Sequence, residues 1–410
     1  MDIGDFQFLS FGSVVAYLVN YSGTSDSITL PSAPNGAKYV ITEDVFKSNT
    51  LLKHITIPSS VSEIEAGAFS GCTNLETVTF EGDITSLPDS LFSGCKNHIS
   101  VDLSRAASIA SIGSAAFSGC NAMTALLLHG DVAVKNVGDE AFYACTAITE
   151  LKLGSTLESV GTAAFSKCYE LTDLNLGTII TEIPEKLFFN CKKLNTVTIR
   201  EGITAIGASA FSGCTSLKSV SLPVTLESVG TSAFEGSGIE SIGFSEGITL
   251  IGASAFKDCT KLTSVILPSS MRNVYSNAFF GCSRLAEVYI PENIESVGMS
   301  AFANCPDLAK LTTPILANNI NYYFNLNNSS VKAPLTQITI IGTAALDNEF
   351  FVPNQTQTKK VTFSRSVSAI ELKYIRVNAD IYYEGSEEEW NSITTGSVAS
   401  AYTVNFYFLL

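Results

Sequence analysis

Apolar side chains recur along this chain in one pattern that returns every 22 to 25 residues. One segment places Leu194, Val197, Ile199, Ile203 and Ile206 at its apolar positions, and other segments align with it column by column. The consensus unit reads L-x-x-V-x-L-x-x-x-I-x-x-I-G-x-x-A-F-x-x-C. An array of similar units of this length predicts a solenoid, in which each unit stacks on its neighbours because it cannot bury its apolar face alone.

The most regular column is a phenylalanine near the end of each unit, which we expect to face the core. It is found at Phe46, Phe69, Phe92, Phe117, Phe142, Phe165, Phe188, Phe211, Phe234, Phe256, Phe279 and Phe302.

The V-x-L pair has a period of two residues, which predicts one short strand per unit with both apolar side chains on one face. Strands that repeat in every unit must pair in parallel with their counterparts, about 4.8 Å apart. The Ile-Gly step, as at Ile206-Gly207 and Val229-Gly230, predicts a turn. Glycine there is expected to supply backbone angles that a Cβ opposes.

The pattern divides the chain into three parts. Residues 1–50 form a predicted N-terminal cap, residues 51–311 the regular repeats, and residues 312–410 an irregular segment followed by degenerate repeats and a C-terminal cap. The register is lost from Thr312 to Pro334. Strand columns return at Ile338/Ile340, Val361/Phe363 and Ile381/Tyr383, and Val404, Phe406 and Phe408 are expected to form a last strand.

Composition narrows the class of protein. A 46% apolar content with 15% charged residues favours a packed, ordered chain. The net charge of −15 argues against nucleic acid or an anionic membrane as a partner. The apolar runs are too short to cross a bilayer, so no membrane insertion is expected. The first residues lack the basic and apolar segments of an export signal, so any such signal is expected to have been removed or never to have existed.

All ten cysteines stand three residues after a repeat phenylalanine, and Ser237 takes the same place in one repeat. A column that accepts Cys and Ser indicates a small residue at a buried corner, so we expect free, buried thiols. Equivalent thiols in adjacent units would have parallel Cβ directions, which do not favour a disulfide. Zinc is the alternative, but the paired Cys-x-x-Cys spacing is missing. We therefore predict no metal and no cofactor.

Three segments carry a resemblance to a known family. They are Leu262-Thr-Ser-Val-Ile-Leu-Pro268, Ala210-Phe-Ser-Gly-Cys214 and Ile381-Tyr-Tyr-Glu-Gly-Ser-Glu-Glu-Glu-Trp-Asn391. The columns resemble the BspA-like leucine-rich repeats of bacterial and trichomonad surface proteins, over roughly residues 25 to 395. The resemblance implies a leucine-rich-repeat solenoid that is extracellular or attached to the cell surface and engaged in adhesion. The family has no catalytic residues to carry over.

Two surfaces are candidates for binding a partner. The first is the solvent face of the strands, where the residues between Val and Leu include Thr198, Ser221 and Tyr289. The second is Tyr322-Tyr323-Phe324, expected to be an exposed contact patch on an inserted loop. The alternative for this aromatic-rich part of the chain is a cap that covers the last unit.

The leading hypothesis for function is a non-catalytic cell-surface or secreted protein that adheres to a host matrix or cell-surface protein. The alternative is a structural spacer within a larger surface protein. An enzyme is disfavoured because no Ser-His-Asp set, metal cluster or phosphate-binding loop is present in the repeats.

Overall fold

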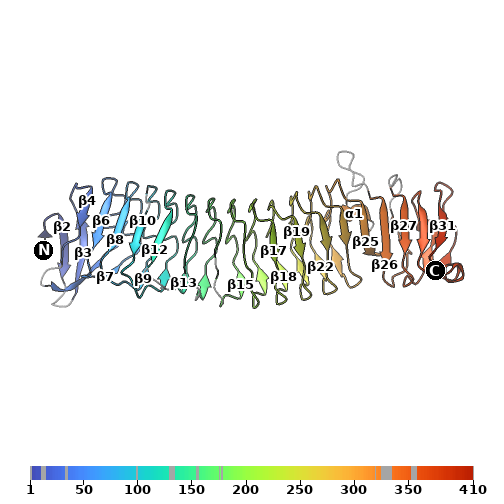
Figure 1. The fold of residues 1–410 in the computed structure, drawn as a ribbon, viewed down its shortest axis with the longest axis horizontal. Coiled ribbons are helices and arrows are strands. Elements are labelled where there is room, and N and C mark those ends of the chain that lie inside the picture. The colour runs from blue at the N-terminus through green and yellow to red at the C-terminus, as the bar shows by residue number, and fades with distance from the viewer. Residues whose placement is uncertain are drawn as a thin grey trace. The chain divides into compact units, whose positions relative to one another are not determined.

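The computed structural model describes residues 2–10, 15–32, 36–97, 100–128, 134–153, 157–174, 176, 179–318, 320–324, 335–351 and 358–409. The chain forms two compact units. Unit 1 comprises Met1–Ile203 and Ala210–Leu217, and unit 2 comprises Thr204–Ser209 and Lys218–Leu410. Each unit is a parallel β-solenoid, which confirms the predicted fold class. Within each unit, strands of successive repeats lie side by side (Figure 1).

In unit 1 the V-x-L columns form a five-stranded parallel sheet in the order β12-β10-β8-β6-β4. Equivalent residues pair directly, as Ile55 does with Val78. Further along, the Glu150–Asp173 bridge continues this column. The strands are β4 (Ser27–Thr29), β6 (His54–Ile57), β8 (Thr77–Phe80), β10 (Ser100–Leu103) and β12 (Ala125–Leu128).

In unit 2 the same column gives a two-stranded sheet and a seven-stranded parallel sheet. The two-stranded sheet pairs β17 (Ser219–Ser221) with β19 (Ser241–Gly243). The three strand columns predicted after the irregular segment are confirmed as β26, β27 and β29. The seven strands are β21 (Ser264–Ile266), β23 (Glu287–Tyr289), β25 (Lys310–Pro314), β26 (Gln337–Ile341), β27 (Lys360–Phe363), β29 (Asp380–Tyr383) and β31 (Asn405–Phe408).

The expectation of one strand per repeat is wrong, because a second, two-residue strand ends at the Ile or Val of the Ile-Gly step, directly before the glycine. In unit 2 this column runs β16-β18-β20-β22-β24, and in unit 1 β9-β11-β13-β14. The bounds are β9 (Ser86–Leu87), β11 (Ser111–Ile112), β13 (Asn136–Val137), β14 (Ser159–Val160), β15 (Glu182–Ile183), β16 (Ala205–Ile206), β18 (Ser228–Val229), β20 (Leu250–Ile251), β22 (Asn273–Val274) and β24 (Ser296–Val297).

Glycine occupies this step for a different reason from the expected one. Gly138, Gly252 and Gly298 do not have a positive φ, so the backbone angle does not require glycine at these positions. A Cβ on Gly138 would lie 2.5 Å from the backbone nitrogen of Ser114, and one on Gly298 would lie 2.3 Å from that of Ser276. Glycine is required here because adjacent repeats approach closely. The left-handed residues lie elsewhere, two positions before and after the phenylalanine.

Stacked phenylalanine rings form the core of each unit. In unit 1, consecutive ring centroids from Phe46 to Phe211 lie 5.1 to 5.8 Å apart. In unit 2, those from Phe234 to Phe302 lie 5.1 to 5.2 Å apart. Every ring in these two series is buried. The core is therefore a continuous column of aromatic contacts within each unit, as the repeating phenylalanine predicts.

Both ends of the chain depart from the repeat. At the N-terminus, β1 (Asp2–Ile3), β2 (Phe6–Ser10) and β3 (Val15–Tyr21) pair antiparallel, and β5 (Lys38–Ile41) and β7 (Val61–Ile64) join in parallel. Near the C-terminus are β28 (Ile370–Glu371), the 3-10 helix Leu372–Tyr374, α2 (Glu387–Ile393) and β30 (Thr394–Thr395). A reciprocal Ser386–Glu389 capping box starts α2. Within the described segments, no helix is long and apolar enough to span a bilayer.

Candidate functional site

The strand face is exposed where the sequence places its candidate residues. Thr198 in unit 1 is exposed, and so are Ser221 and Tyr289 in unit 2. In β23 the burial alternates exposed, buried, exposed, because Val288 points into the core between Glu287 and Tyr289. This alternation confirms that the residues between the two apolar strand positions face solvent.

An exposed apolar pair stands out on this face in unit 2. Ile266 pairs directly with Tyr289 across β21 and β23, and their side chains are 63% and 36% exposed. Thr312 follows Tyr289 in the ladder on β25. Sequence reasoning selected Tyr289 for its aromatic ring and passed over Ile266. The signal was available, since a β-branched apolar residue at an outward position departs from the Ser and Thr typical of the column.

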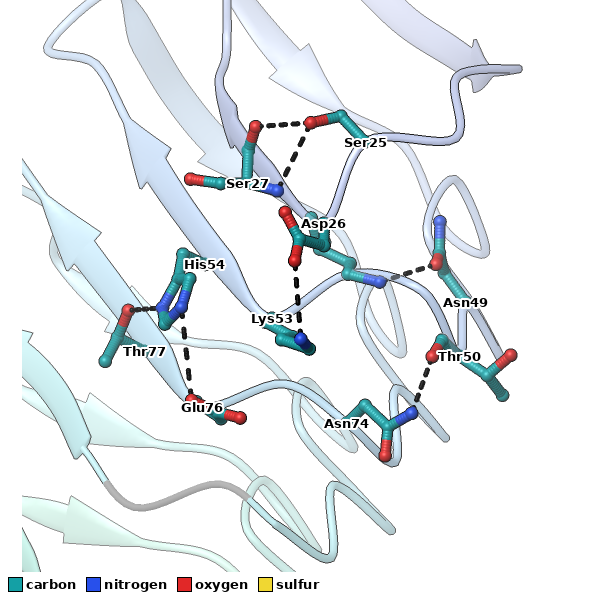
Figure 2. A network of polar contacts seen from close by, with 11 residues as sticks. Ser25, Asp26, Ser27, Asn49, Thr50, Lys53, His54, Asn74, Glu76 and Thr77 are labelled. Carbon is teal, nitrogen blue, oxygen red and sulfur yellow. Dashed lines mark hydrogen bonds and ion pairs between the residues drawn. The ribbon is translucent and has the colours of Figure 1, made fainter.

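Charged side chains beside the strands form ion pairs between adjacent repeats, as Figure 2 shows for the N-terminal part of unit 1. Lys53 Nζ lies 3.3 Å from Asp26 Oδ2 of the preceding repeat. His54 Nε2 lies 4.0 Å from Glu76, and its Nδ1 lies 2.9 Å from Thr77 Oγ1 (Figure 2). Exposed pairs of this kind contribute about 0–1 kcal/mol each. Their main effect is to leave fewer isolated charges along the edge of the face.

The second candidate surface is not a loop. Residues Ile320–Phe324 form the short helix α1, in which Tyr323 and Phe324 are each 2% exposed. Phe324 stacks on Phe302 with centroids 5.4 Å apart, so it continues the phenylalanine column beyond Thr312. The Tyr323 hydroxyl accepts a hydrogen bond from the Asn318 backbone N–H. The expected exposed patch is therefore wrong for Tyr323 and Phe324, because both fill the core of the next repeat.

Tyr322 alone of this triplet is exposed, at 39%. The Tyr322 carbonyl accepts a hydrogen bond from the Ser300 N–H at 2.8 Å. Tyr322 therefore lies beside the preceding repeat, on the side of the solenoid formed by the turns around the repeat phenylalanines, which we call the turn side. Two neighbouring repeats add exposed apolar side chains near the same turn, Met299 at 54% and Tyr275 at 49%. Three successive repeats of unit 2 thus each carry one exposed apolar residue, Tyr275, Met299 and Tyr322.

The cysteine column is structural. All ten thiols are buried and free. Each donates its S–H to the carbonyl of the phenylalanine in the preceding repeat, as Cys95 does to Phe69 at 3.2 Å and Cys168 to Phe142 at 3.2 Å. Burial raises the pKa of Cys168 to about 12. The thiol therefore keeps its proton at neutral pH, and the inter-repeat hydrogen bond is maintained.

One cavity of about 310 Å³ opens in unit 2 where the repeat containing α1 joins the regular array. Glu292, Pro314 and Gly342 are among the residues that line it. Over the part of the chain that the structure describes, no three His, Cys, Asp or Glu side chains are grouped to hold a metal ion.

A column of parallel V-x-L strands, a second column of two-residue strands and a buried phenylalanine stack define a leucine-rich-repeat solenoid. The chain belongs to the family described as the BspA type leucine rich repeat region, which matches residues 39–134, 131–238 and 204–332. This confirms the resemblance found in the sequence. A comparison with curated proteins gave no match.

A solved structure supports the fold. A leucine-rich repeat protein from Bacteroides ovatus ATCC 8483 is 21% identical, with 100% of both chains covered and a TM-score of 0.69. A leucine rich cell surface protein from Faecalibacterium prausnitzii A2-165 is 22% identical, covering 97% of this chain and 98% of the other, with a TM-score of 0.33. The pneumococcal vaccine antigen PcpA is 17% identical over 99% and 98%, with a TM-score of 0.47. At this level of identity the first match shows the fold alone, and the other two TM-scores add nothing to it.

Proposed function

We propose that this protein is a non-catalytic, cell-surface or secreted interaction protein that adheres to a protein on a host matrix or another cell. The support is its membership of the BspA-type repeat family together with an extended, solvent-facing row of strand residues. Arrays of this kind offer long surfaces that suit large partners. The observation that carries the proposal is the exposed Ile266–Tyr289 pair on that row.

Physical chemistry favours the pair as the centre of a contact. Interface energy concentrates in a few apolar and aromatic side chains surrounded by polar ones. Ile266 and Tyr289 meet this description, because small or polar residues such as Ser264, Glu287 and Thr312 flank them in the same ladders. Ser221, on the same face of unit 2, fits the polar surroundings of such a contact better than its centre, and Thr198 belongs to the strand face of unit 1.

The test is binding of the protein to immobilised matrix proteins and to intact host cells. We expect an Ile266→Ala/Tyr289→Ala variant to bind at least about fivefold more weakly, as removal of an interface anchor does. The variant Tyr322→Ala is the matched comparison, because it removes one exposed aromatic ring from the turn side. Equal loss in both variants would contradict a contact centred on the strand face, and loss in Tyr322→Ala alone would move the contact to Tyr275, Met299 and Tyr322.

A structural spacer is the second candidate, favoured by the ion pairs that join adjacent repeats. The ion pairs Lys135–Glu158 at 3.0 Å and Lys193–Glu170 at 2.5 Å join charged groups of the protein to each other, so these groups are not directed toward a partner. Absence of binding to every matrix protein and cell type, with the fold intact by circular dichroism, would support the spacer over adhesion.

A further inference from the structure

The strand β31 has an open edge. It is the outermost member of the seven-stranded sheet of unit 2. On one side it pairs in parallel with β29, where Ile381 is opposite Phe406 and Tyr382 is opposite Tyr407. Among the described residues, no strand pairs with its other side. An edge strand presents backbone donors and acceptors to any strand that can reach it.

The direction of these backbone groups follows from one hydrogen bond. The Leu409 N–H donates to the Tyr383 carbonyl at 2.8 Å, so Leu409 and every second residue before it direct their backbone groups toward β29. The N–H and C=O of Phe406 and Phe408 consequently point away from the sheet, because successive residues of a strand alternate. The open edge thus offers two donors and two acceptors.

Three side chains at this edge are also partly exposed. Phe406, Tyr407 and Leu409 are 38%, 43% and 44% exposed. Ile381, which occupies the register position of Phe406 on the preceding strand, is 1% exposed. Edge strands of soluble proteins are commonly protected by charge or proline. Residues 391–410 contain no Asp, Glu, Lys, Arg or Pro.

We propose that β31 pairs antiparallel with β31 of a second copy of this chain, about a two-fold axis at Tyr407. In this register Phe406 of each copy is opposite Phe408 of the other, so that all the outward backbone groups are used. Tyr407 meets its own counterpart in a non-hydrogen-bonded pair, with Cα atoms about 4.5 Å apart. The two rings then extend the existing stack of Tyr382 on Tyr407, whose centroids lie 4.9 Å apart.

Charge selects a second copy as the occupant. The chain carries a net charge of −15, so most surfaces of two copies repel each other. Residues 391–410 carry no charged side chain, so this edge adds nothing to that repulsion, and a basic partner strand would find no carboxylate side chain on β31. On the adjacent strand, Asp380 accepts a hydrogen bond from Asn405 at 2.9 Å. A two-fold interface requires a self-complementary patch, and a neutral strand edge meets that condition.

Light scattering and sedimentation equilibrium over a concentration series test the pairing. We expect the wild-type chain to dimerise and Tyr407→Lys to raise the dissociation constant by at least about tenfold, because like charges directly opposite oppose strand pairing. Tyr289→Lys is the matched control: it changes an exposed tyrosine in the same outward column on a strand paired on both sides, and should leave the dimer intact. A monomeric wild-type chain, or equal dimerisation of Tyr407→Lys, would overturn the proposal.

A cross-linking experiment tests the register and remains informative if Tyr407→Lys misfolds. The native cysteines are all buried, so Tyr407→Cys introduces the one exposed thiol among the described residues. Opposed cysteines in a non-hydrogen-bonded pair lie within disulfide reach. Treatment with oxidised glutathione should give a disulfide-linked dimer of Tyr407→Cys and none of Tyr289→Cys. Failure of Tyr407→Cys to cross-link more than Tyr289→Cys would rule out the two-fold register.

Discussion

Truncation of one ring in the phenylalanine stack gives the most direct test of how this fold is held together. Phe279 is fully buried, and its ring lies 5.2 Å from Phe256 and 5.2 Å from Phe302, at interplanar angles of 3° and 2°. Replacing a buried phenylalanine by alanine costs about 3–5 kcal/mol. We place Phe279→Ala at the upper end, about 4–5 kcal/mol, because stacked contacts are lost on both sides.

The loss should be local, because each repeat is stabilised by its neighbours only. Hydrogen exchange read by mass spectrometry should show reduced protection in the repeats of Phe256, Phe279 and Phe302 and little change in unit 1. Denaturant unfolding should broaden or divide into steps. The variant Phe279→Leu retains most of the volume and should cost about 1 kcal/mol, and the surface variant Ile266→Ala less than about 0.5 kcal/mol.

Two results would refute this reasoning. Uniform loss of protection throughout unit 1 and unit 2 would mean that the array unfolds as one cooperative body. An unchanged free energy of unfolding in Phe279→Ala would mean that the ring contributes little to the core, contrary to its complete burial.

The closely packed glycines, the buried thiols and the Glu246 carboxylate can each be tested by substitution or labelling. A Cβ added at Gly230 would lie 2.7 Å from a carbonyl oxygen of the adjacent repeat, whereas a Cβ added at Gly243 would have no atom within 4 Å. Calorimetry should therefore find Gly230→Ala destabilised by about 1–3 kcal/mol and Gly243→Ala close to neutral. Burial raises the pKa of Cys72 to about 12, so about one thiol in ten thousand is ionised at pH 8 and a thiol reagent should label few sites before denaturation and ten after it; rapid labelling of the native protein would contradict a buried column. Hydrogen bonds from the Ser269 backbone N–H and hydroxyl lower the pKa of Glu246. The contribution of Glu246 to folding stability is therefore present above its unfolded-state pKa of about 4.3 and is lost as the pH falls through its lower folded-state pKa. The denaturation midpoint of Glu246→Gln should fall less steeply than that of wild type below pH of about 4.

The repeat pattern predicts the parts of the fold that depend on side-chain burial. The V-x-L strands, the phenylalanine core and the buried thiols could all be deduced because each leaves a periodic apolar or small residue. The exposure of Thr198, Ser221 and Tyr289 followed from strand alternation. The second strand escaped prediction because it is only two residues long, as at Ser228–Val229, and so is too short to show an alternation of buried and exposed side chains.

The aromatic triplet shows a different kind of error. Phe324 follows Phe302 by 22 residues, within the range of the other intervals, so its place in the core could have been read from the sequence. The lost strand pattern after Thr312 obscured it. The open edge of β31 could not be recognised in this way, because Val404, Phe406 and Phe408 follow the same alternation as an internal strand. The identity of a binding partner leaves no periodic signal at all.

The phenylalanine stack, the thiol-to-carbonyl bond and the glycine contact each join a fixed position of one repeat to a fixed position of the adjacent repeat. Duplication of a whole repeat therefore reproduces every one of these contacts, and deletion of a whole repeat restores them across the junction. The array can change its length in the course of evolution without a new core having to arise. Outward strand residues such as Ile266 and Tyr289 take no part in the phenylalanine, thiol and glycine contacts between repeats. Selection can alter what the surface recognises, and how far it extends, while the architecture beneath it stays the same.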